Sequence, residues 1–237
     1  MLKVIGVIGY KDSGKTTLVH ALARELVSRG HKVAVIKHMS HPVDLADKDT
    51  AMLGKAVDQV GFISPQESGI LWKRELDLED ILAHLEAQFV LVEGFKRKTT
   101  FPKIVCLRGE PDDQELFDGL VICAVGPTDQ VEDVEVPHLG WHEIGKIADL
   151  AERRGFMLPG LDCGECGYER CSGLAHEIVA GSRSAEDCVP LKSTTEVRID
   201  GRQIPLNSFV STMVRSTVLG LLSPLKGFRQ GNVEIRF

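Results

Sequence analysis

The sequence predicts an α/β fold in which a doubly wound, mainly parallel sheet is followed by a small cysteine-rich module and a short α+β tail. Short apolar runs alternate with helical segments over residues 1–152, which is the pattern of strands joined by crossover helices. Some of these runs are continuously apolar, as in strands that are covered on both faces. Residues 156–192 hold four of the six cysteines, and residues 193–237 return to ordinary strand and helix signals.

The first part of the predicted sheet follows from two apolar runs and the helix between them. Residues 3–8 predict the first strand, and Lys15 to Ser28 repeat leucines at helical spacing before Gly30, which is placed to end the helix. The run KVAVIKH predicts a second strand, which we expect to be buried on both faces. Residues 40–50 are polar and acid-rich and predict a loop.

A hairpin and a further helix come next in the predicted order. Two short strands at 59–64 and 69–73 flank a turn at Pro65. Residues 77–87 predict an amphipathic helix that is capped by Asp77. That helix leads into the run QFVLVEGF, a third buried strand.

Two more apolar runs, PKIVCLR and LVICAVG, complete the predicted sheet. Residues 141–154 then predict a last helix, which ends at Gly155. In the tail, the dipeptide Asp200-Gly201 predicts a hairpin, residues 208–222 predict a helix, and NVEIRF predicts a closing strand.

Composition limits the class of protein. The chain has 237 residues, of which 43% are hydrophobic and 26% charged, and its net charge is -6 at pH 7. An acidic balance does not favour nucleic-acid binding, and no apolar run approaches the roughly 20 residues that span a bilayer. The N-terminus lacks the pattern of a signal peptide. We therefore expect a cytoplasmic protein with reduced cysteines, in which a tight cysteine cluster indicates metal binding or catalysis.

A phosphate-binding loop of the P-loop NTPase type is predicted where the first strand meets the first helix. The stretch from Gly9 to Thr16 fits G-x-x-x-x-G-K-[ST] in this strand–loop–helix context, which disfavours a glycine-rich turn that binds nothing. Its backbone amides would face a phosphate chain, Lys15 would reach the β- and γ-phosphates, and Thr16 would offer its hydroxyl to Mg²⁺. The candidate residues of the loop are Gly9, Lys11, Asp12, Ser13, Gly14, Lys15 and Thr16.

Acidic residues beyond the loop are candidates to complete the nucleotide-binding site. Glu93 ends a strand, where its carboxylate could hold Mg²⁺ or simply face solvent. Asp44, Asp47 and Asp49 occupy a usual place for a segment that senses the γ-phosphate, although acid-rich loops are commonly just solvated. The Asn-Lys-x-Asp signature of guanine recognition is absent, and Asp129 is a candidate contact to a purine edge.

The stretches GYKDSGKTTL, VAVIKHMSH, DKDT and LVEGFKRKTTFPKI resemble, in that order, the molybdopterin-guanine dinucleotide biosynthesis protein B (MobB) family over roughly residues 2–150. The resemblance implies a dimer that binds GTP and hydrolyses it weakly. Such a dimer assists the nucleotidyltransferase that joins GMP to the molybdenum or tungsten pterin, so guanine nucleotide, molybdopterin and that enzyme are the implied partners.

The resemblance also implies roles for individual residues. Lys15 and Glu93 would be the catalytic pair, with Thr16 and Glu93 at Mg²⁺. The residues that match the phosphate and Mg²⁺ positions of the family are Gly9, Gly14, Lys15, Thr16 and Thr17, with Glu93 as the acid. Lys37, His38 and Lys96 match positions that we expect near the nucleotide or pterin phosphates, although a lone histidine is more often structural.

Four cysteines form a spaced cluster, Cys163-x2-Cys166-x4-Cys171-x16-Cys188. Four thiolates can hold Zn²⁺ or an iron–sulfur cluster, but structural zinc usually uses two matched pairs, and here the fourth cysteine is alone. The stretch LPGLDCGECGYERCSGLAHEIVAGSRSAEDC is similar to the [4Fe-4S] module of the corrinoid iron–sulfur protein and of the iron–sulfur component of the Rnf electron-transport complex. It departs from them at Val189, where a proline is frequent.

Two functions of another class remain open. One is an ATP-driven electron-transfer protein, although the nitrogenase type needs a lysine directly after the first loop glycine, where this chain has Tyr10 and places Lys11 one position late. The other is a redox-sensing protein whose nucleotide loop only stabilises the fold. Cys106 and Cys123 lie inside apolar runs and are interpreted as small buried hydrophobic residues.

Overall fold

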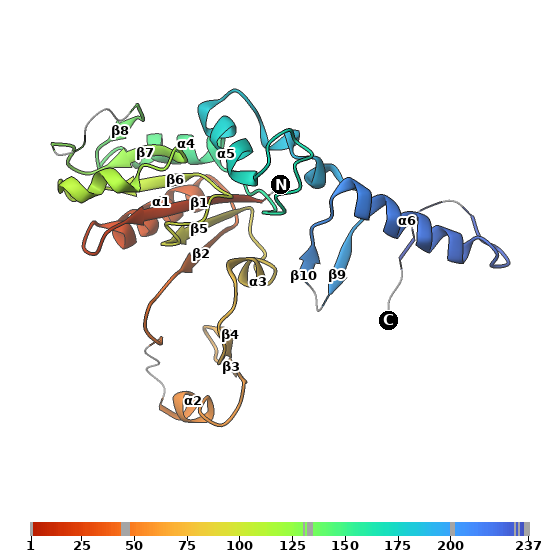
Figure 1. Cartoon of the computed structure of the whole chain (residues 1–237). Coiled ribbons are helices and arrows are strands. Elements are labelled where there is room, and N and C mark those ends of the chain that lie inside the picture. The colour runs from red at the N-terminus through yellow and green to blue at the C-terminus, as the bar shows by residue number, and fades with distance from the viewer. Residues whose placement is uncertain are drawn as a thin grey trace.

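Six parallel strands form the central sheet, in the order β2-β5-β1-β6-β7-β8 (Figure 1). The strands are β1 (Lys3–Gly9), β2 (Val33–Lys37), β5 (Phe89–Glu93), β6 (Lys103–Cys106), β7 (Val121–Val125) and β8 (His138–Leu139). The computed structural model describes residues 2–43, 48–129, 131, 135–199, 202–229, 231 and 233–234. The predicted parallel α/β sheet is confirmed.

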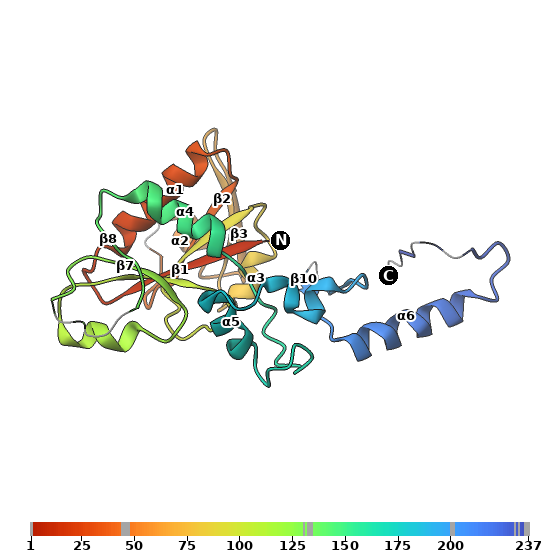
Figure 2. The same ribbon diagram turned by 90° about the horizontal axis from the view of Figure 1, so that it is seen from above.

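Helices and turns cover both faces of this sheet. On one face, α1 (Lys15–Ser28) and α4 (Ile144–Arg154) lie side by side over the strands, and their apolar side chains join the largest core cluster (Figure 2). On the other face lie the short α3 (Leu78–Leu82), the 3-10 helix η1 (Pro111–Leu116) and the ring of Phe101. Burial of β1 and β5 between these layers fixes the strand ends, where the predicted phosphate loop begins.

The strand β2 lies at the edge of the sheet, so the prediction that it is buried on both faces was wrong. Among the described strands it pairs with β5, in a register that sets Lys37 opposite Glu93. Val35 is 47% exposed on the open side. An apolar run therefore indicated a strand here, but not its place in the sheet.

Three helices differ from their predicted bounds. The helix α2 (Lys48–Leu53) begins inside the segment predicted as a loop. The helix α3 ends at Leu82, five residues early. The helix α4 begins three residues late because Gly140 to Glu143 form a turn, in which the Gly140 amide donates to the Glu143 carboxylate at 2.8 Å.

A two-stranded arm projects from the sheet between β2 and β5, with α2 at its outer end (Figure 1). Its strands β3 (Gln59–Ile63) and β4 (Ser68–Trp72) pair antiparallel, as the predicted hairpin requires. Several apolar side chains of the arm face solvent, and Ile63 is 90% exposed. An exposed apolar surface of this kind is a candidate contact surface for another protein.

The cysteine-rich segment packs on the sheet domain through α5 (Cys171–Ala180). Side chains of α5 join Leu120, Phe156 and Leu158 in a second core cluster, and Arg154 donates to the Val179 carbonyl at 3.0 Å. These contacts dock the module against the end of α4.

The tail leads away from the rest of the molecule (Figures 1 and 2). Its strands β9 (Val197–Ile199) and β10 (Arg202–Ile204) pair antiparallel, and α6 (Ser208–Leu222) has the predicted bounds. The predicted turn at Asp200 and Gly201 lies outside the described residues, as does most of the predicted closing strand. Within the described part of the chain, no helix is long and apolar enough to cross a membrane.

A buried lysine ties the carboxyl-end loop of β5 to the base of β6. Lys103 is fully buried, donates to the Lys96 carbonyl at 2.7 Å and forms an ion pair with Asp118. Its replacement by alanine should lower the free energy of unfolding by about 2–4 kcal/mol, because it leaves the Lys96 carbonyl and one carboxylate oxygen of Asp118 without their donor, while the Leu120 amide still donates to the other oxygen.

Denaturant unfolding of Lys103→Ala measures this loss. The matched control is Lys146→Ala, which breaks an exposed ion pair with Glu143 and should cost less than about 1 kcal/mol. Equal losses in the two variants would contradict a structural role for the buried lysine.

Candidate functional site

The loop after β1 has the backbone of a phosphate cradle. Gly9 and Gly14 have φ angles of 157° and 82°, and Asp12 has a φ angle of 62°. A Cβ atom on Gly9 would lie 2.3 Å from the Ser13 hydroxyl and 2.6 Å from the Cys106 carbonyl oxygen, so this position requires glycine. The chain thus turns tightly from β1 into α1, as the sequence predicts.

Polar groups of this loop are arranged to bind an anion. The Ser13 residue is 4% exposed, and its hydroxyl has no hydrogen-bond partner among the described residues. The start of α1 has no side-chain cap, so its first amides are open to a ligand. Open amides at a helix N-terminus attract phosphate. The loop therefore fits a bound phosphate chain.

Thr16, Glu93 and Lys37 meet beside the loop, as the sequence predicts. The Thr16 hydroxyl donates to Glu93 Oε1 at 2.9 Å, and Lys37 Nζ lies 3.5 Å from the same oxygen. Glu93 is 7% exposed. A hydroxyl and a carboxylate in contact offer the hard oxygen ligands that Mg²⁺ prefers. The pair fits a divalent cation next to the phosphate loop.

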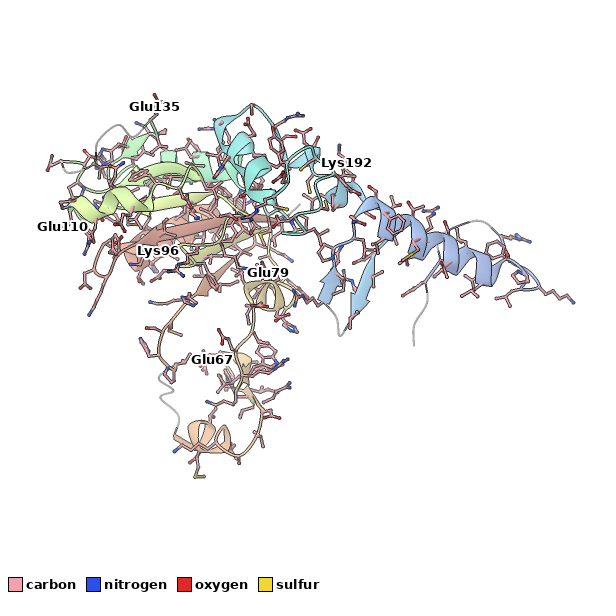
Figure 3. All side chains as sticks on the ribbon, in the orientation of Figure 1. Glu67, Glu79, Lys96, Glu110, Glu135 and Lys192 are labelled. Carbon is pink, nitrogen blue, oxygen red and sulfur yellow. The ribbon has the colours of Figure 1, made fainter. Side chains whose placement is uncertain are left out.

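A stack of cations and an aromatic ring lies at the same edge of the sheet. Lys96 Nζ lies 3.6 Å from the centre of the Tyr10 ring, and the Arg108 guanidinium lies 4.6 Å from it. Lys15 donates to the Tyr10 carbonyl. Burial, then the charges of Lys15 and Arg108, lower the pKa of Lys96. A bound polyphosphate would relieve the repulsion between these positive charges. Figure 3 shows Lys96 near the carboxyl ends of the strands.

A cavity of about 680 Å³ opens beside the loop. His38 lies in it with its ring 4.6 Å from that of Phe95, so a structural contact accompanies the predicted role of this histidine. The lining holds five basic side chains and no carboxylate. The lining residues are Gly9, Lys15, His38, Gly94, Phe95, Lys96, Arg97 and Lys98. Such a lining favours an anionic ligand.

The other predicted site residues lie on the exposed side of the loop or in other parts of the fold. Lys11, Asp12 and Thr17 are exposed around the loop. Asp49 lies in α2 at the outer end of the arm, so it is not brought to the phosphate loop (Figure 1). Asp129 is exposed after β7.

Asp44 and Asp47, the other predicted sensors of the γ-phosphate, lie outside the described residues. Three residues near the loop were missed in the sequence: Tyr10, Arg108 and Trp141. Arg108 and Trp141 lie in loops without a motif, whereas Tyr10 lies inside the phosphate-loop motif, at a position whose residue type the motif does not specify.

The four predicted ligand cysteines line one small cavity. Cys171 and Cys188 are buried, and Cys163 and Cys166 are half-buried. The Asp162 amide donates to Cys171 Sγ at 3.4 Å, and its carboxylate accepts from the Cys171 amide at 2.7 Å. The structure therefore brings together four thiols that are spread over 26 residues of sequence.

The glycines of this module leave the backbone free to approach the sulfurs. Gly164 and Gly167 have φ angles of 77° and 91°, which side chains rarely permit. A Cβ atom on either would meet open space, so the backbone conformation and not crowding accounts for glycine there. Amides held in this way can donate to cluster sulfurs.

Burial shifts the pKa of two of the four clustered thiols. Burial raises the pKa of Cys188 to about 11 and also raises that of Cys171. The described residues include no group of three or more His, Cys, Asp or Glu side chains placed to hold a single metal ion. Four cysteines are a usual ligand set of an iron–sulfur cluster.

Cys106 and Cys123 are fully buried in β6 and β7, and burial raises the pKa of both thiols to about 12. The interpretation of these two as buried hydrophobic residues is confirmed.

The cysteine module and the phosphate loop lie at opposite ends of the sheet. The module packs on Leu120, which precedes β7, and the Leu158 amide donates to the carbonyl of Thr100, which precedes β6. The phosphate loop instead follows β1. Figure 3 labels Glu110, in the loop that follows β6, and Lys192, at the end of the cysteine module, on opposite sides of the sheet domain.

Comparison with known proteins gives the family. A model described as "Molybdopterin guanine dinucleotide synthesis protein B" matches residues 4–125, which is more than half of the chain. This protein belongs to the MobB family. A second model, described as "Putative Fe-S cluster", matches residues 158–190, which contain all four clustered cysteines.

Relatives of this MobB-family protein differ in how much of it they match. A "Putative molybdopterin-guanine dinucleotide biosynthesis adapter protein" of Methanocaldococcus jannaschii is 32% identical over 234 residues, 95% of this chain and 93% of the relative. An adapter protein of Haemophilus influenzae is 36% identical over 46% of this chain and 65% of its own. The crystal structure of Bacillus subtilis MobB matches with a TM-score of 0.52 and 21% identity, over 63% of this chain and 98% of that one. This last match supports the fold.

Proposed function

We propose that this MobB-family protein is a cytoplasmic GTP-binding accessory protein of molybdopterin-guanine dinucleotide assembly that hydrolyses GTP weakly and carries a [4Fe-4S] cluster. The observation that carries the proposal is the contact between Thr16 and Glu93 beside a phosphate loop with an unpartnered buried hydroxyl. The Escherichia coli relative, 28% identical over 163 residues, is named a molybdopterin-guanine dinucleotide biosynthesis adapter protein, which supports the pathway.

The roles of the residues follow from their positions. The loop amides and Lys15 would bind the phosphates, and Thr16 and Glu93 would hold Mg²⁺, which supplies positive charge at the β- and γ-phosphates when bound. Lys37 and Lys96 would add positive charge beside the bound phosphates. The basic cavity beside them would accept a second anionic group, such as the phosphate of molybdopterin.

The proposed partners use other surfaces. The exposed apolar side chains of the arm, Phe62, Ile63 and Ile70, favour a homodimer contact there. The nucleotidyltransferase that adds GMP would then receive nucleotide or pterin from the face that carries the basic cavity. We propose three units, residues 1–152 for the nucleotide, residues 156–192 for the cluster and residues 193–237 as a tail.

The cluster assignment rests on the cysteine module. Four thiols line one cavity, and two flanking glycines have left-handed backbone conformations. The cluster supplies electron transfer or a structural cross-link when bound; the protein's own contribution is four thiolates and the amide of Asp162. A redox role is favoured by the half-buried Cys163 and Cys166.

Guanine preference is the most direct test of this function. In a competition titration with a fluorescent nucleotide, GTP should displace the probe at a concentration at least about ten times lower than ATP does, a difference of roughly 1.4 kcal/mol. Equal affinity for GTP and ATP would contradict the proposal and support the ATP-driven electron-transfer alternative.

A further inference from the structure

We propose that Trp141 forms the wall of the nucleotide site on the side of the base, and that its indole stacks on the guanine ring. This inference rests on the proposed function and deepens it by assigning a residue to base binding. It is needed because the usual guanine-reading motif is absent from this sequence.

The position of Trp141 against the phosphate loop is the first step. A Cβ atom on Gly14, the residue that begins α1, would lie 2.5 Å from Cη2 of the Trp141 ring. The indole therefore contacts the phosphate loop next to the first backbone amides of α1. Trp141 nevertheless remains 43% exposed, so part of its ring faces solvent beside the phosphate site.

The direction of a bound nucleotide is the second step. Thr16, Glu93 and Lys37 define the Mg²⁺ side of the loop, and they lie toward β5 and β2. Trp141 follows β8, at the opposite edge of the same sheet. A nucleotide is a linear chain of γ-, β- and α-phosphate, ribose and base. When its terminal phosphates lie toward β5, its base extends toward the loops that follow β6, β7 and β8.

The chemistry of the two sides supports this direction. The cavity on the β5 side is lined by five basic side chains, which suit phosphates and not an uncharged base. Trp141 instead offers a flat apolar surface, and a base stacks on an aromatic ring whatever its hydrogen-bonding edge. Stacking on Trp141 would add affinity for the nucleoside, while recognition of guanine would need a polar group at its edge.

The turn that carries Trp141 is held in place. Glu143 accepts from the Gly140 amide at 2.8 Å and from Lys146 Nζ at 2.7 Å. The contact with Gly140 spans the turn and has Trp141 inside it, and the Glu143 amide also donates to the Gly140 carbonyl at 3.0 Å. A stacking surface fixed before the ligand arrives loses little freedom on binding.

The test separates the base from the phosphates. Isothermal titration with Mg²⁺-GTP and with Mg²⁺-tripolyphosphate, which has no base, compares the wild type with Trp141→Ala and Trp141→Phe. The alanine variant should bind GTP about 5- to 100-fold more weakly and bind tripolyphosphate unchanged. The phenylalanine variant should recover most of the GTP affinity, because it keeps a flat ring.

Fluorescence gives an independent reading. The chain has two tryptophans, and Trp72 lies in the arm, where it stacks on His84 with ring centres 5.0 Å apart. In the Trp72→Phe variant all tryptophan emission comes from Trp141. GTP should change that emission more strongly than tripolyphosphate does.

Three results would overturn the inference. Equal loss of GTP and tripolyphosphate in Trp141→Ala would make the indole a support of the phosphate loop, and no loss of either would remove it from the site. Failure of the wild type to bind GTP would instead refute the proposed function, and this inference with it.

Discussion

Replacing Lys15 with alanine should abolish GTP hydrolysis and weaken GTP binding by about 100-fold or more while leaving the fold intact. Lys15 is the basic residue that opens α1, and its ammonium group already lies over the loop, on the Tyr10 carbonyl. Removing a charge that faces the β- and γ-phosphates costs roughly 10²- to 10³-fold in comparable sites. Titration calorimetry and phosphate release measure the two effects.

Lys32→Ala is the matched control for this variant. Lys32 is an exposed lysine just before β2, at the end of the strand away from the phosphate loop. Its loss changes net charge by the same amount but should leave nucleotide binding unchanged. If Lys15→Ala binds and turns over GTP as the wild type does, the assignment of the phosphate loop is wrong.

Replacing Cys171 with serine should remove the cluster and disorder the cysteine module while the sheet domain keeps binding GTP. Cys171 is buried in the core cluster that joins the module to the sheet. The module is small and lies mostly in loops, so a bound cluster would contribute a large part of its folding free energy. Iron and sulfide content measures the cluster, and limited proteolysis at the module measures its order.

Cys106→Ala is the control for cluster retention. Cys106 is as buried as any ligand cysteine but lies in β6, at the carboxyl end of the sheet. This variant should lose stability through a small cavity and keep its iron. Full iron content in Cys171→Ser, or iron loss in Cys106→Ala, would show that the set of four ligands is wrong.

The elements that the sequence predicted well have apolar residues at regular helical spacing. The helix over Lys15 to Ser28 and the helix over Ser208 to Leu222 have the predicted bounds, because apolar residues and end signals agree along them. The strand β2 was placed wrongly because an apolar run does not encode strand order. Helix α3 stopped early even though its cap at Asp77 was predicted correctly.

The centre of the candidate site was predictable for a topological reason. Parallel strands bring their carboxyl ends to one edge, and the register that pairs Val7 with Glu93 sets Glu93 beside the loop that follows β1. Thr16 and Glu93 therefore meet although 77 residues separate them. Tyr10 lies in the predicted phosphate loop, but the loops that bring Lys96 and Arg108 onto its ring follow paths that no sequence pattern fixes.

The separation of the two sites limits how they can communicate. The cluster module covers the amino ends of β6 and β7, whereas the phosphate loop follows the carboxyl end of β1. Direct contact between cluster and nucleotide within one chain is therefore not possible in this arrangement. Any coupling between them would have to pass through the sheet or through a second protein molecule.

The most direct test of the central claim, that a MobB-type nucleotide domain carries an iron–sulfur module, is iron and acid-labile sulfide analysis of protein purified without oxygen. The account predicts about four iron and four sulfide per chain, in a brown protein whose visible absorption is bleached by reductant or air. A colourless, air-stable protein with about one zinc per chain would contradict it.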